Sequence, residues 1–370
     1  MYQYDLIIVG SGLYGAVVAY MQKRRGLRVL VLERRSVVGG NIRDEWNDGI
    51  CVHMYGAHIF HTDMEDVWRF VNTLSPFDSY QHLVLARSGG RLYHLPISMQ
   101  TMYEVYGITN PSQMTSIFDR ERQQEHYDNP MNLEEQAINL VGRTLYELLI
   151  KGYTEKQWGC KASHLPASII NRLPIRKTFN TDYFDNSYQG IPRNGYSHLI
   201  SQLLRDIEVK TNVDFNKEKG YWLKQARHIV YTGMTDELGD YELGNLEYRS
   251  LIFEHQRLET DNFQGCAVVN EVDKKVPYTR TIEHRNFHPK SDVMGHTVIT
   301  REYPATWRQG REAYYPINNI HNNLLYQRYS ELIHRKFPQI SLGGRLGLYR
   351  YLDMDAAISL AMNHKLTQLF

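Results

Sequence analysis

Three glycines near the N-terminus have the spacing of a phosphate-binding loop. They are Gly10, Gly12 and Gly15, in the pattern Gly-x-Gly-x-x-Gly. The first allows a tight turn, the second lets the backbone approach a pyrophosphate, and the third lets a helix pack close to a strand. The N–H groups and the positive dipole end of that helix favour an anion. The motif therefore predicts a bound dinucleotide.

An acidic residue follows this loop at about the distance that is typical of a ribose-binding carboxylate. Glu33 comes after Gly15 at close to the interval of about 20 residues at which a carboxylate binds the ribose hydroxyls of a dinucleotide. Arg34 and Arg35 come next and could bind a 2′-phosphate, but a carboxylate at position 33 repels such a phosphate. We therefore expect a dinucleotide with a free adenosine ribose, either FAD or NAD.

Arginine and aromatic residues recur together through the rest of the chain, which contains 27 tyrosines. A guanidinium binds phosphate oxygens in a bidentate manner, and a tyrosine hydroxyl donates a hydrogen bond without adding charge. Aromatic rings also give a nucleobase a flat surface. This chemistry fits a nucleoside diphosphate bound in addition to the dinucleotide. The candidate residues are Tyr153, Trp158, Arg172, Arg176, Tyr183, Asn270, Arg280, Glu283, His284, Tyr314, Tyr315, Arg345, Tyr351 and Asp353.

The histidines and cysteines do not indicate a metal site. His58 and His61 are three residues apart, but no third ligand follows at a suitable spacing. We expect the His58 imidazole to lie against a cofactor ring and His61 to be structural. The three cysteines are far apart, which argues against a disulfide scaffold or a zinc ribbon and favours a reducing compartment.

The glycine loop lies between two predicted parallel strands. Apolar runs predict strands at 5–9 and 28–32, and residues 13–25 predict the helix between them. This is a βαβ unit. A hairpin is expected around Ser88-Gly89-Gly90, and the pattern from 101 to 173 is helical.

Further elements are expected towards the C-terminus. Helices are predicted at 114–127, 133–153, 323–337 and 355–368, and a strand and turn at GGRLGLYRYLDMD. Short strands between 248 and 298, TRTIEHRNF among them, predict an antiparallel sheet.

The net charge is +1, from 42 basic and 41 acidic residues. A balance so close to zero argues against nucleic acid or an acidic membrane as the partner. The N-terminus has no signal-peptide pattern, and no apolar run approaches the roughly 18 residues that cross a membrane. We expect a cytoplasmic protein.

Ten motifs in one order resemble the bacterial UDP-galactopyranose mutases. They are GSGLYG, VLERRSVVGGN, YGAHIFHT, LPI, GYTEKQWG, IPRNGY, VPYTRTIEH, REYP, YYPI and GRLGLYRYLDMD. The glycine pair Gly39-Gly40, followed by Asn41, also resembles the sequence of long FAD-binding chains.

The resemblance implies an α/β fold. A FAD-binding Rossmann-like domain (1–80, 190–245 and 318–370) would carry an inserted helical bundle (101–189) with a mobile substrate loop. A twisted antiparallel sheet domain (81–100 and 246–317) would be the third domain. The resemblance also implies that the protein forms homodimers. The implied activity is the interconversion of UDP-galactopyranose and UDP-galactofuranose for cell-surface polysaccharides, with reduced FAD whose N5 attacks the anomeric carbon.

Site residues are implied by the same motifs. Arg172 and Arg280 would clamp the diphosphate, and His58 would lie between sugar and flavin. Tyr183, Tyr314, Tyr315 and Tyr351 would donate to phosphate, Tyr153 and Trp158 would line the uridine and sugar region, and Asn270 would lie near the sugar. The implied cofactor-binding residues are Gly10, Gly12, Leu13, Gly15, Glu33, Arg34, Gly40, Asn41, His58, Ile59, Arg345 and Asp353. His82, in SYQHLV, stands where relatives have an amide, so the resemblance leaves the identity of the sugar open, an N-acetylated UDP-hexose included.

Two other functions share the dinucleotide motif. A flavin amine or alcohol oxidase would have an apolar substrate pocket, and the arginine and tyrosine set argues against it. A non-catalytic dinucleotide sensor would bind the cofactor without turning over a sugar nucleotide.

Overall fold

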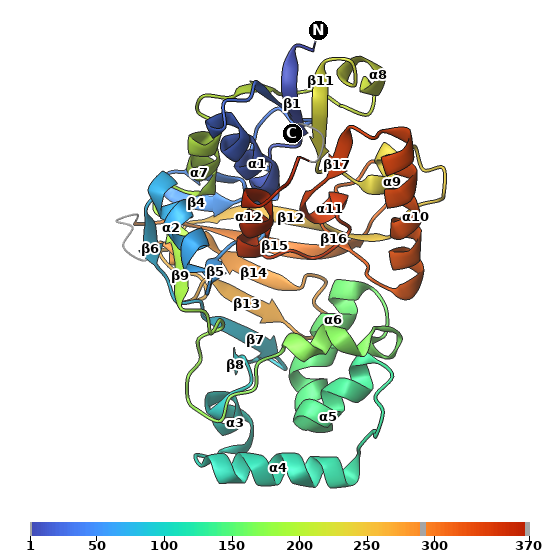
Figure 1. The fold of residues 1–370 in the computed structure, drawn as a ribbon. Helices are drawn as coiled ribbons and strands as arrows, with labels where there is room; N and C mark the ends of the chain where they lie inside the picture. Colours follow the sequence, from blue (N-terminus) through green and yellow to red (C-terminus); the bar gives the residue numbers. More distant parts are fainter. Residues whose placement is uncertain (1, 289–293, 367–370) are drawn as a thin grey trace.

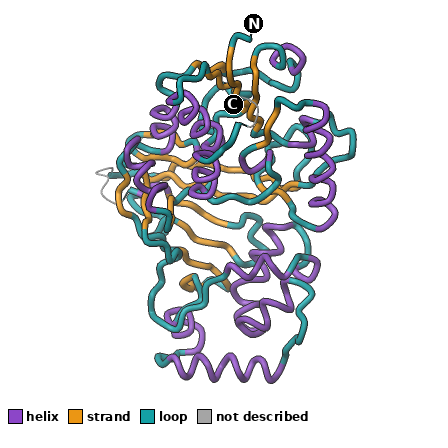
Figure 2. The backbone as a smooth tube through the Cα atoms, viewed as in Figure 1, coloured by secondary structure: helices purple, strands orange, loops and turns teal. Residues whose placement is uncertain are grey.

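A computed structural model describes residues 2–288 and 294–366, apart from the side chains of Asn171 and Arg172. In Figure 1 a parallel sheet lies at the top, a large antiparallel sheet crosses the middle and a group of helices lies at the bottom. Figure 2 shows the strands of the large sheet running across the centre of the molecule. No helix in the described residues is both long enough and apolar enough to cross a membrane.

Five parallel strands support the glycine loop, as the βαβ unit predicted. Their order is β10–β2–β1–β11–β17, with β1 at Tyr4–Val9, β2 at Val29–Leu32, β10 at Glu208–Lys210, β11 at Ala226–Tyr231 and β17 at Ile340–Leu342. Ile7 of β1 lies opposite both Leu30 and Ile229, and it is fully buried. A continuous apolar run suits a parallel sheet because helices cover both of its faces.

Helices pack on the two faces of this sheet (Figure 1). One face, with Leu6 and Ile8, is covered by α1 (Leu13–Arg24), α2 (Glu65–Leu74), α7 (Tyr196–Leu203) and α12 (Met354–Met362). The other face, with Ile7, packs against α8 (Lys219–Trp222), α9 (Thr235–Leu238) and α10 (Ile320–Lys336).

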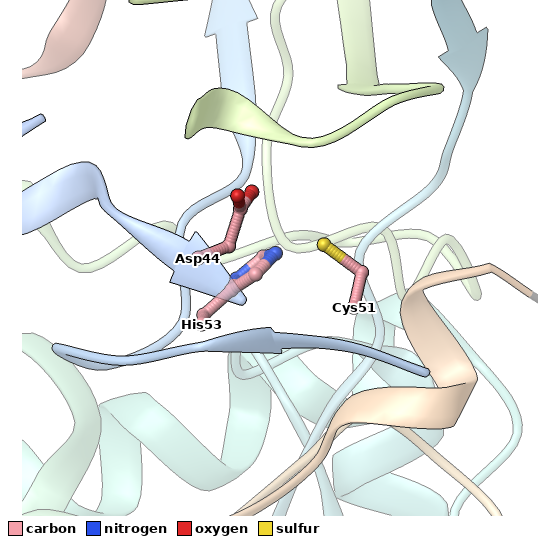
Figure 3. Close-up of side chains that lie close together, drawn as sticks. All are labelled: Asp44, Cys51 and His53. Carbon is pink, nitrogen blue, oxygen red and sulfur yellow. The ribbon is translucent and has the colours of Figure 1, made fainter. Parts of the chain in front are cut away.

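A buried carboxylate joins the start of α7 to a small hairpin. The hairpin consists of β3 (Asp44–Asn47) and β4 (Ile50–His53). Asp44 is 4% exposed, and its carboxylate accepts hydrogen bonds from the backbone N–H groups of Tyr196 and Ser197. It thereby satisfies two N–H groups that the first turn of a helix leaves free. Figure 3 shows its carboxylate close to the side chains of Cys51 and His53.

Seven strands form the central sheet, in the order β16–β12–β15–β14–β13–β7–β8. All neighbouring pairs are antiparallel except β13 and β7. The strands are β7 (Val84–Ser88), β8 (Arg91–Leu95), β12 (Tyr248–Leu258), β13 (Val268–Glu271), β14 (Arg280–Glu283), β15 (Thr297–Thr306) and β16 (Tyr315–Pro316). The predicted hairpin and antiparallel sheet are confirmed.

A third sheet returns the chain from the helices to the parallel sheet. Strand β9 (Tyr188–Pro192) pairs with β5 (Phe60–Thr62) on one side and with β6 (Phe77–Ser79) on the other. Short helical turns complete the fold: η1 (Gly40–Ile42), η3 (Ala162–His164), η4 (Ala167–Arg172), η5 (His284–Phe287) and α11 (Gly344–Gly347).

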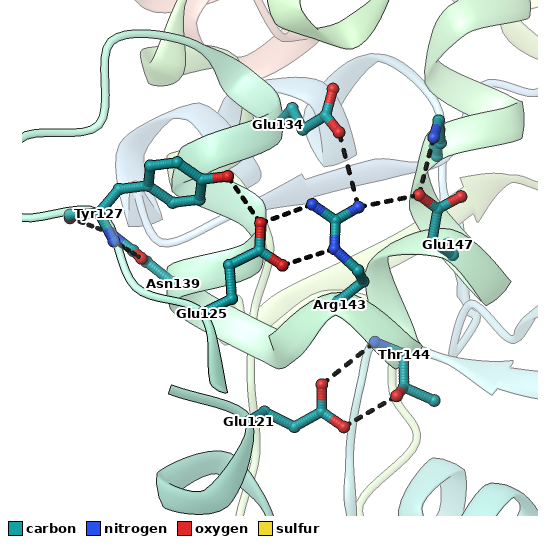
Figure 4. Close-up of polar contacts among 9 residues, drawn as sticks. Glu121, Glu125, Tyr127, Glu134, Asn139, Arg143, Thr144 and Glu147 are labelled. Atoms are coloured by element: carbon teal, nitrogen blue, oxygen red, sulfur yellow. Dashed lines mark hydrogen bonds and ion pairs between the residues drawn. The ribbon is translucent and has the colours of Figure 1, made fainter. Parts of the chain in front are cut away.

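The lower helices are α3 (Met99–Tyr106), α4 (Pro111–Gln124), α5 (Leu133–Leu145) and α6 (Lys151–Trp158). Arg143 of α5 binds the carboxylate of Glu125, at the end of α4, through Nε at 2.5 Å and Nη2 at 2.6 Å (Figure 4). This pair lowers the pKa of Glu125 to about 2. The bidentate contact fixes α4 against α5.

Several predicted elements differ in detail from the structure. The helix expected over 133–153 is interrupted at Gly142, whose φ of +80° is not helical, and by the π-helical turn η2 (Tyr146–Ile150). In TRTIEHRNF the strand ends at Glu283, and a helical turn follows. The GGRLG segment forms α11 rather than a strand. Its last residue, Gly347, packs against the end of β11, where a Cβ would lie 2.8 Å from the carbonyl oxygen of Tyr231. The last predicted helix, 355–368, ends at Met362, and residues 363–366 are not helical. Its residues 367 and 368 lie outside the described residues. The three-domain division stays a prediction.

We expect Asp44→Ala to lower the free energy of unfolding by about 1–3 kcal/mol, because two buried N–H groups lose a charged acceptor. Chemical denaturation measures this change. Asp78→Ala is the control, since Asp78 is 47% exposed and pairs with Arg193 at the surface, where removal costs less than about 1 kcal/mol. An equal loss in the two variants would contradict the capping role of Asp44.

Candidate active site

Two glycine turns meet and form a backbone cradle at the start of α1. Gly12 is the N-cap of α1, and a Cβ at Gly40 would lie 2.8 Å from its Cα atom. A Cβ at Gly15 would lie 2.1 Å from the carbonyl oxygen of Gly10. Side chains at these positions would fill the space above the helix N-terminus. The close approach leaves room there for a pyrophosphate.

Glu33 directly follows β2, and its side chain is hydrogen-bonded to the glycine loop. Its carboxylate accepts hydrogen bonds from the backbone N–H of Ser11 at 3.0 Å and from that of Arg35 at 2.8 Å. Arg35 lies over the ring of Tyr55 and donates through Nη2 to Asn41 and Glu312. Its other terminal nitrogen, Nη1, is buried without a hydrogen-bond partner among the described residues. A donor of this kind suits an anionic ligand.

One cavity collects most of the predicted cofactor-binding residues. Its lining includes Gly10, Gly12, Leu13, Gly15, Glu33, Arg34, Gly40, Asn41, His58 and Arg345. Ile59 is 7% exposed and packs in the core, outside this lining. The glycine cradle and the unpaired Arg35 nitrogen show that the residues present fit a dinucleotide.

His58 is one of the residues that line the cavity. Its Nδ1 atom lies 2.8 Å from the carbonyl oxygen of Gly56. Burial, the charge of Arg345 and, less strongly, the charge of Arg280 lower the pKa of His58 to about 4. The imidazole is therefore neutral near pH 7. With the Nδ1 proton donated to Gly56, Nε2 is left as an acceptor.

Arg280 lies between three elements. Its Nη2 donates to the hydroxyl of Tyr153 on α6, and its Nε lies 3.6 Å from the buried carboxylate of Glu302 on β15. The side chain is 25% exposed, so part of the guanidinium is free to bind a ligand. Asn270 lies directly opposite on β13, and its Oδ1 is buried without a partner in the part of the chain that the structure describes. These groups form a polar surface ready for a phosphate or sugar.

A second guanidinium is flanked by two tyrosines. Arg345 lies 5.6 Å from the ring centre of Tyr315 and 5.0 Å from that of Tyr351. The two rings stack with their centres 6.1 Å apart. Burial, and then Glu302, raise the pKa of the Tyr315 hydroxyl, which therefore remains a hydrogen-bond donor. Tyr315 and Tyr351 are thus brought together with Arg345, and the charge of Arg280 also acts on Tyr315.

Tyr183 lies in the segment before β9, within electrostatic reach of Arg280 and Tyr153. Its backbone N–H donates to the carbonyl of His82 at 2.9 Å, and its ring packs edge-on against the imidazole of His82. Burial and then the charge of Arg280 lower the pKa of His82 to about 3. The Nδ1 atom of this neutral ring finds no partner among the described groups.

The remaining predicted residues are less closely grouped. Trp158 ends α6, Asp353 is the N-cap of α12, and Tyr314 lines the dinucleotide cavity instead of lying with Tyr315 and Tyr351. Arg172 is in η4, and its side chain lies outside the description. Arg176 hydrogen-bonds the backbone of the loop at Asp182, while Glu283 and His284 are fully buried.

Sequence reasoning missed Glu302 and the contacts of Arg35. Glu302 occurs in the REYP motif, and its neighbours in the sequence do not indicate its partner. Only the register, in which Arg280 lies opposite Glu302, reveals the pair.

A metal site is not supported. Among the described residues the one candidate cluster is Asp44, Cys51 and His53 (Figure 3). Asp44 already caps α7, and burial, then Asp44, raise the pKa of the Cys51 thiol, which disfavours the thiolate that a metal requires.

Fold and site together define a dinucleotide-binding enzyme with a second, cationic ligand site beside the dinucleotide cavity. A sequence profile for an NAD(P)-binding Rossmann-like domain matches residues 8–74, and one for UDP-galactopyranose mutase matches residues 148–351. The chain belongs to the UDP-galactopyranose mutase family. It is a flavin-dependent mutase.

Individual relatives agree over almost the whole chain. A dTDP-fucopyranose mutase of Escherichia coli is 37% identical over 96% of both chains. A probable UDP-galactopyranose mutase of Klebsiella pneumoniae is 37% identical over 97% of this chain and 93% of its own. The crystal structure of a reduced UDP-galactopyranose mutase matches with a TM-score of 0.74 over 97% of this chain and 94% of its own, at 14% identity, which supports the fold. Polyamine oxidases align with little more than half of the chain, so the oxidase alternative is only distantly supported.

We expect Gly40→Ala to reduce the flavin content of the purified protein severely, because the new methyl group would enter the cradle against Gly12. The ratio of flavin to protein absorbance measures this. Gly89→Ala is a matched control: its φ of +57° equals that of Gly40 within a degree, but a Cβ there meets open space. Similar flavin contents in the two variants would contradict the cradle.

Proposed function

We propose that this enzyme interconverts UDP-galactopyranose and UDP-galactofuranose and requires FAD in its reduced form. The proposal rests on one observation above the others. His58 lines the dinucleotide cavity and lies within the electrostatic reach of Arg280 and Arg345. A diphosphate bound at these arginines would hold its sugar beside the flavin.

Each group has a task that suits its environment. Arg280 and Arg345 would neutralise the diphosphate as it leaves the sugar, and the hydroxyls of Tyr315 and Tyr351 would donate to its oxygens. Asn270 and the neutral His58 would bind sugar hydroxyls. The reduced flavin, when bound, supplies the nucleophile for the anomeric carbon.

Water must be kept from the reacting sugar. The segment that carries Arg172 is the natural cover, since it leads into Tyr183, which is tied to His82. We propose that Arg172 completes the clamp opposite Arg280 when this segment closes over the substrate.

A second substrate has a specific observation in its favour. The E. coli relative named for dTDP-fucopyranose is as similar to this chain as the K. pneumoniae relative. His82, a neutral ring stacked on Phe184, packs against Tyr183, and we propose that it contacts the sugar. A 6-deoxy sugar loses one hydroxyl, so an aromatic ring at this position suits it as well as a hexose.

The assembly and setting follow from the family resemblance. We propose a homodimer that acts in the cytoplasm and provides galactofuranose for cell-surface polysaccharides. Nucleic acid and membranes are not proposed as partners.

The direct test is an anaerobic incubation with UDP-galactose, with and without dithionite, followed by chromatography of the sugar nucleotides. We expect a second UDP-hexose only after reduction, without consumption of reductant in proportion to product. Equal turnover by the oxidised enzyme would contradict the redox requirement. A parallel incubation with dTDP-fucose decides the substrate, and conversion of that compound alone would overturn the assignment to UDP-galactose.

Arg280→Ala should lower kcat/KM at least about tenfold, the value of a charge-assisted hydrogen bond to a partly buried phosphate. Flavin content should be unchanged. Arg301→Ala is the matched control, because Arg301 on neighbouring β15 has the same 25% exposure but contacts Glu254 and Gln256. Near-normal kinetics of the Arg280 variant at low substrate would remove Arg280 from the clamp.

A further inference from the structure

Lys156 on α6 is surrounded by backbone carbonyl groups of a single loop. Its ammonium nitrogen lies 2.7 Å from the carbonyl oxygen of Glu271 and 3.0 Å from those of Asp273, Val276 and Tyr278. All four belong to the end of β13 and to the loop that leads into β14. An ammonium group has three N–H donors, so it gathers these oxygens much as a bound cation would.

The same face of α6 makes two other contacts with this part of the sheet. Tyr153, three residues before Lys156, accepts a hydrogen bond from Arg280, the first residue of β14. Gly152, four residues before Lys156, allows the helix to approach closely, since a Cβ there would lie 2.1 Å from the carbonyl oxygen of Val272. Residues three and four apart share one side of a helix. The loop is thus held to α6 at both ends.

The loop in turn determines where Arg280 and Asn270 lie. Thr279, at its end, donates through its backbone N–H to the carbonyl of Glu302, and Arg280 follows immediately. Asn270, at its start, is paired in register with Arg280. A shift of the loop would therefore move both residues and separate Arg280 from Tyr153.

We propose that Lys156 is a positioning residue that fixes the β13–β14 loop against α6 and so holds Arg280 and Tyr153 in register to bind the diphosphate of the substrate. It acts through these residues and does not itself contact the ligand. The inference rests on the proposed function, because it needs a nucleotide diphosphate at Arg280.

The charge of Lys156 matters as well as its length. A neutral amine would have one N–H donor fewer, and its lone pair would face the carbonyl oxygens and be repelled by them. Burial lowers the pKa of Lys156 to about 8, and the charges of Glu271 and Asp273 on the loop oppose this shift, so that the ammonium form still prevails near pH 7. Glu271 itself pairs with Arg87 on β7. Arginine is a poor replacement, because its planar fork cannot direct N–H groups to four oxygens around one point.

The test measures UDP binding to the flavin-containing protein by calorimetry, in the wild type and in Lys156→Met. We expect Kd for UDP to rise at least about tenfold with flavin content unchanged. Lys151→Met is the matched control, since Lys151 begins the same helix but pairs with Glu147 outside the loop. If the wild type binds UDP and the Lys156→Met and Lys151→Met variants have equal Kd values, the inference is wrong while the proposed function stands. No UDP binding by the wild type would instead overturn the proposed function.

A double-mutant cycle separates positioning from a general loss of stability. In a Tyr153→Phe background, Lys156→Met should weaken UDP binding much less than it does alone, because the contact that it supports is already lost. Additive effects on binding would contradict the proposal. Gly152→Ala provides a second route if the lysine variant does not fold: it keeps Lys156 but pushes α6 from the loop, and normal UDP affinity in that variant would also contradict the proposal.

Discussion

The structure depends on keeping one guanidinium only partly paired at the junction of three elements. Arg280 lies near the buried carboxylate of Glu302 and donates to the hydroxyl of Tyr153, and its charge helps to lower the pKa of His58. A buried carboxylate below the cation offsets part of the cost of removing it from water. The rest of that cost is offset when an anion binds. The central sheet and the helices below it can be understood as the support that this arrangement requires.

The dinucleotide cavity and the cationic site have different physical origins. The cavity is a backbone feature, formed where Gly12 and Gly40 approach without side chains. The cationic site is a side-chain feature, assembled from β14, β15, β16, α6, α11 and the segment that follows α11. His58 connects the two because it stays neutral between two arginines, so that it can accept a hydrogen bond without repelling them.

The sequence was sufficient for the elements whose chemistry is local. About 30 consecutive residues contain the glycine loop, Glu33 and the alternation of strand and helix. The structure has these elements at the predicted positions. It was insufficient where a contact depends on register between distant segments. Glu302 and Lys156 lie 22 and 124 residues from Arg280, and nothing in their neighbours indicates what they face. The helix at 133–153 was misjudged because its apolar spacing continues across Gly142, where the backbone leaves the helical region.

The central claim is that a nucleotide sugar binds at Arg280 and places its sugar beside the flavin. A crystal structure of the flavin-containing protein soaked with UDP-galactose tests this most directly. The account predicts that the diphosphate oxygens contact the guanidinium of Arg280 and the hydroxyls of Tyr315 and Tyr351, with the sugar between His58 and the flavin ring. A UDP-galactose molecule bound with its diphosphate away from Arg280, or with its sugar out of contact with the flavin, would contradict it.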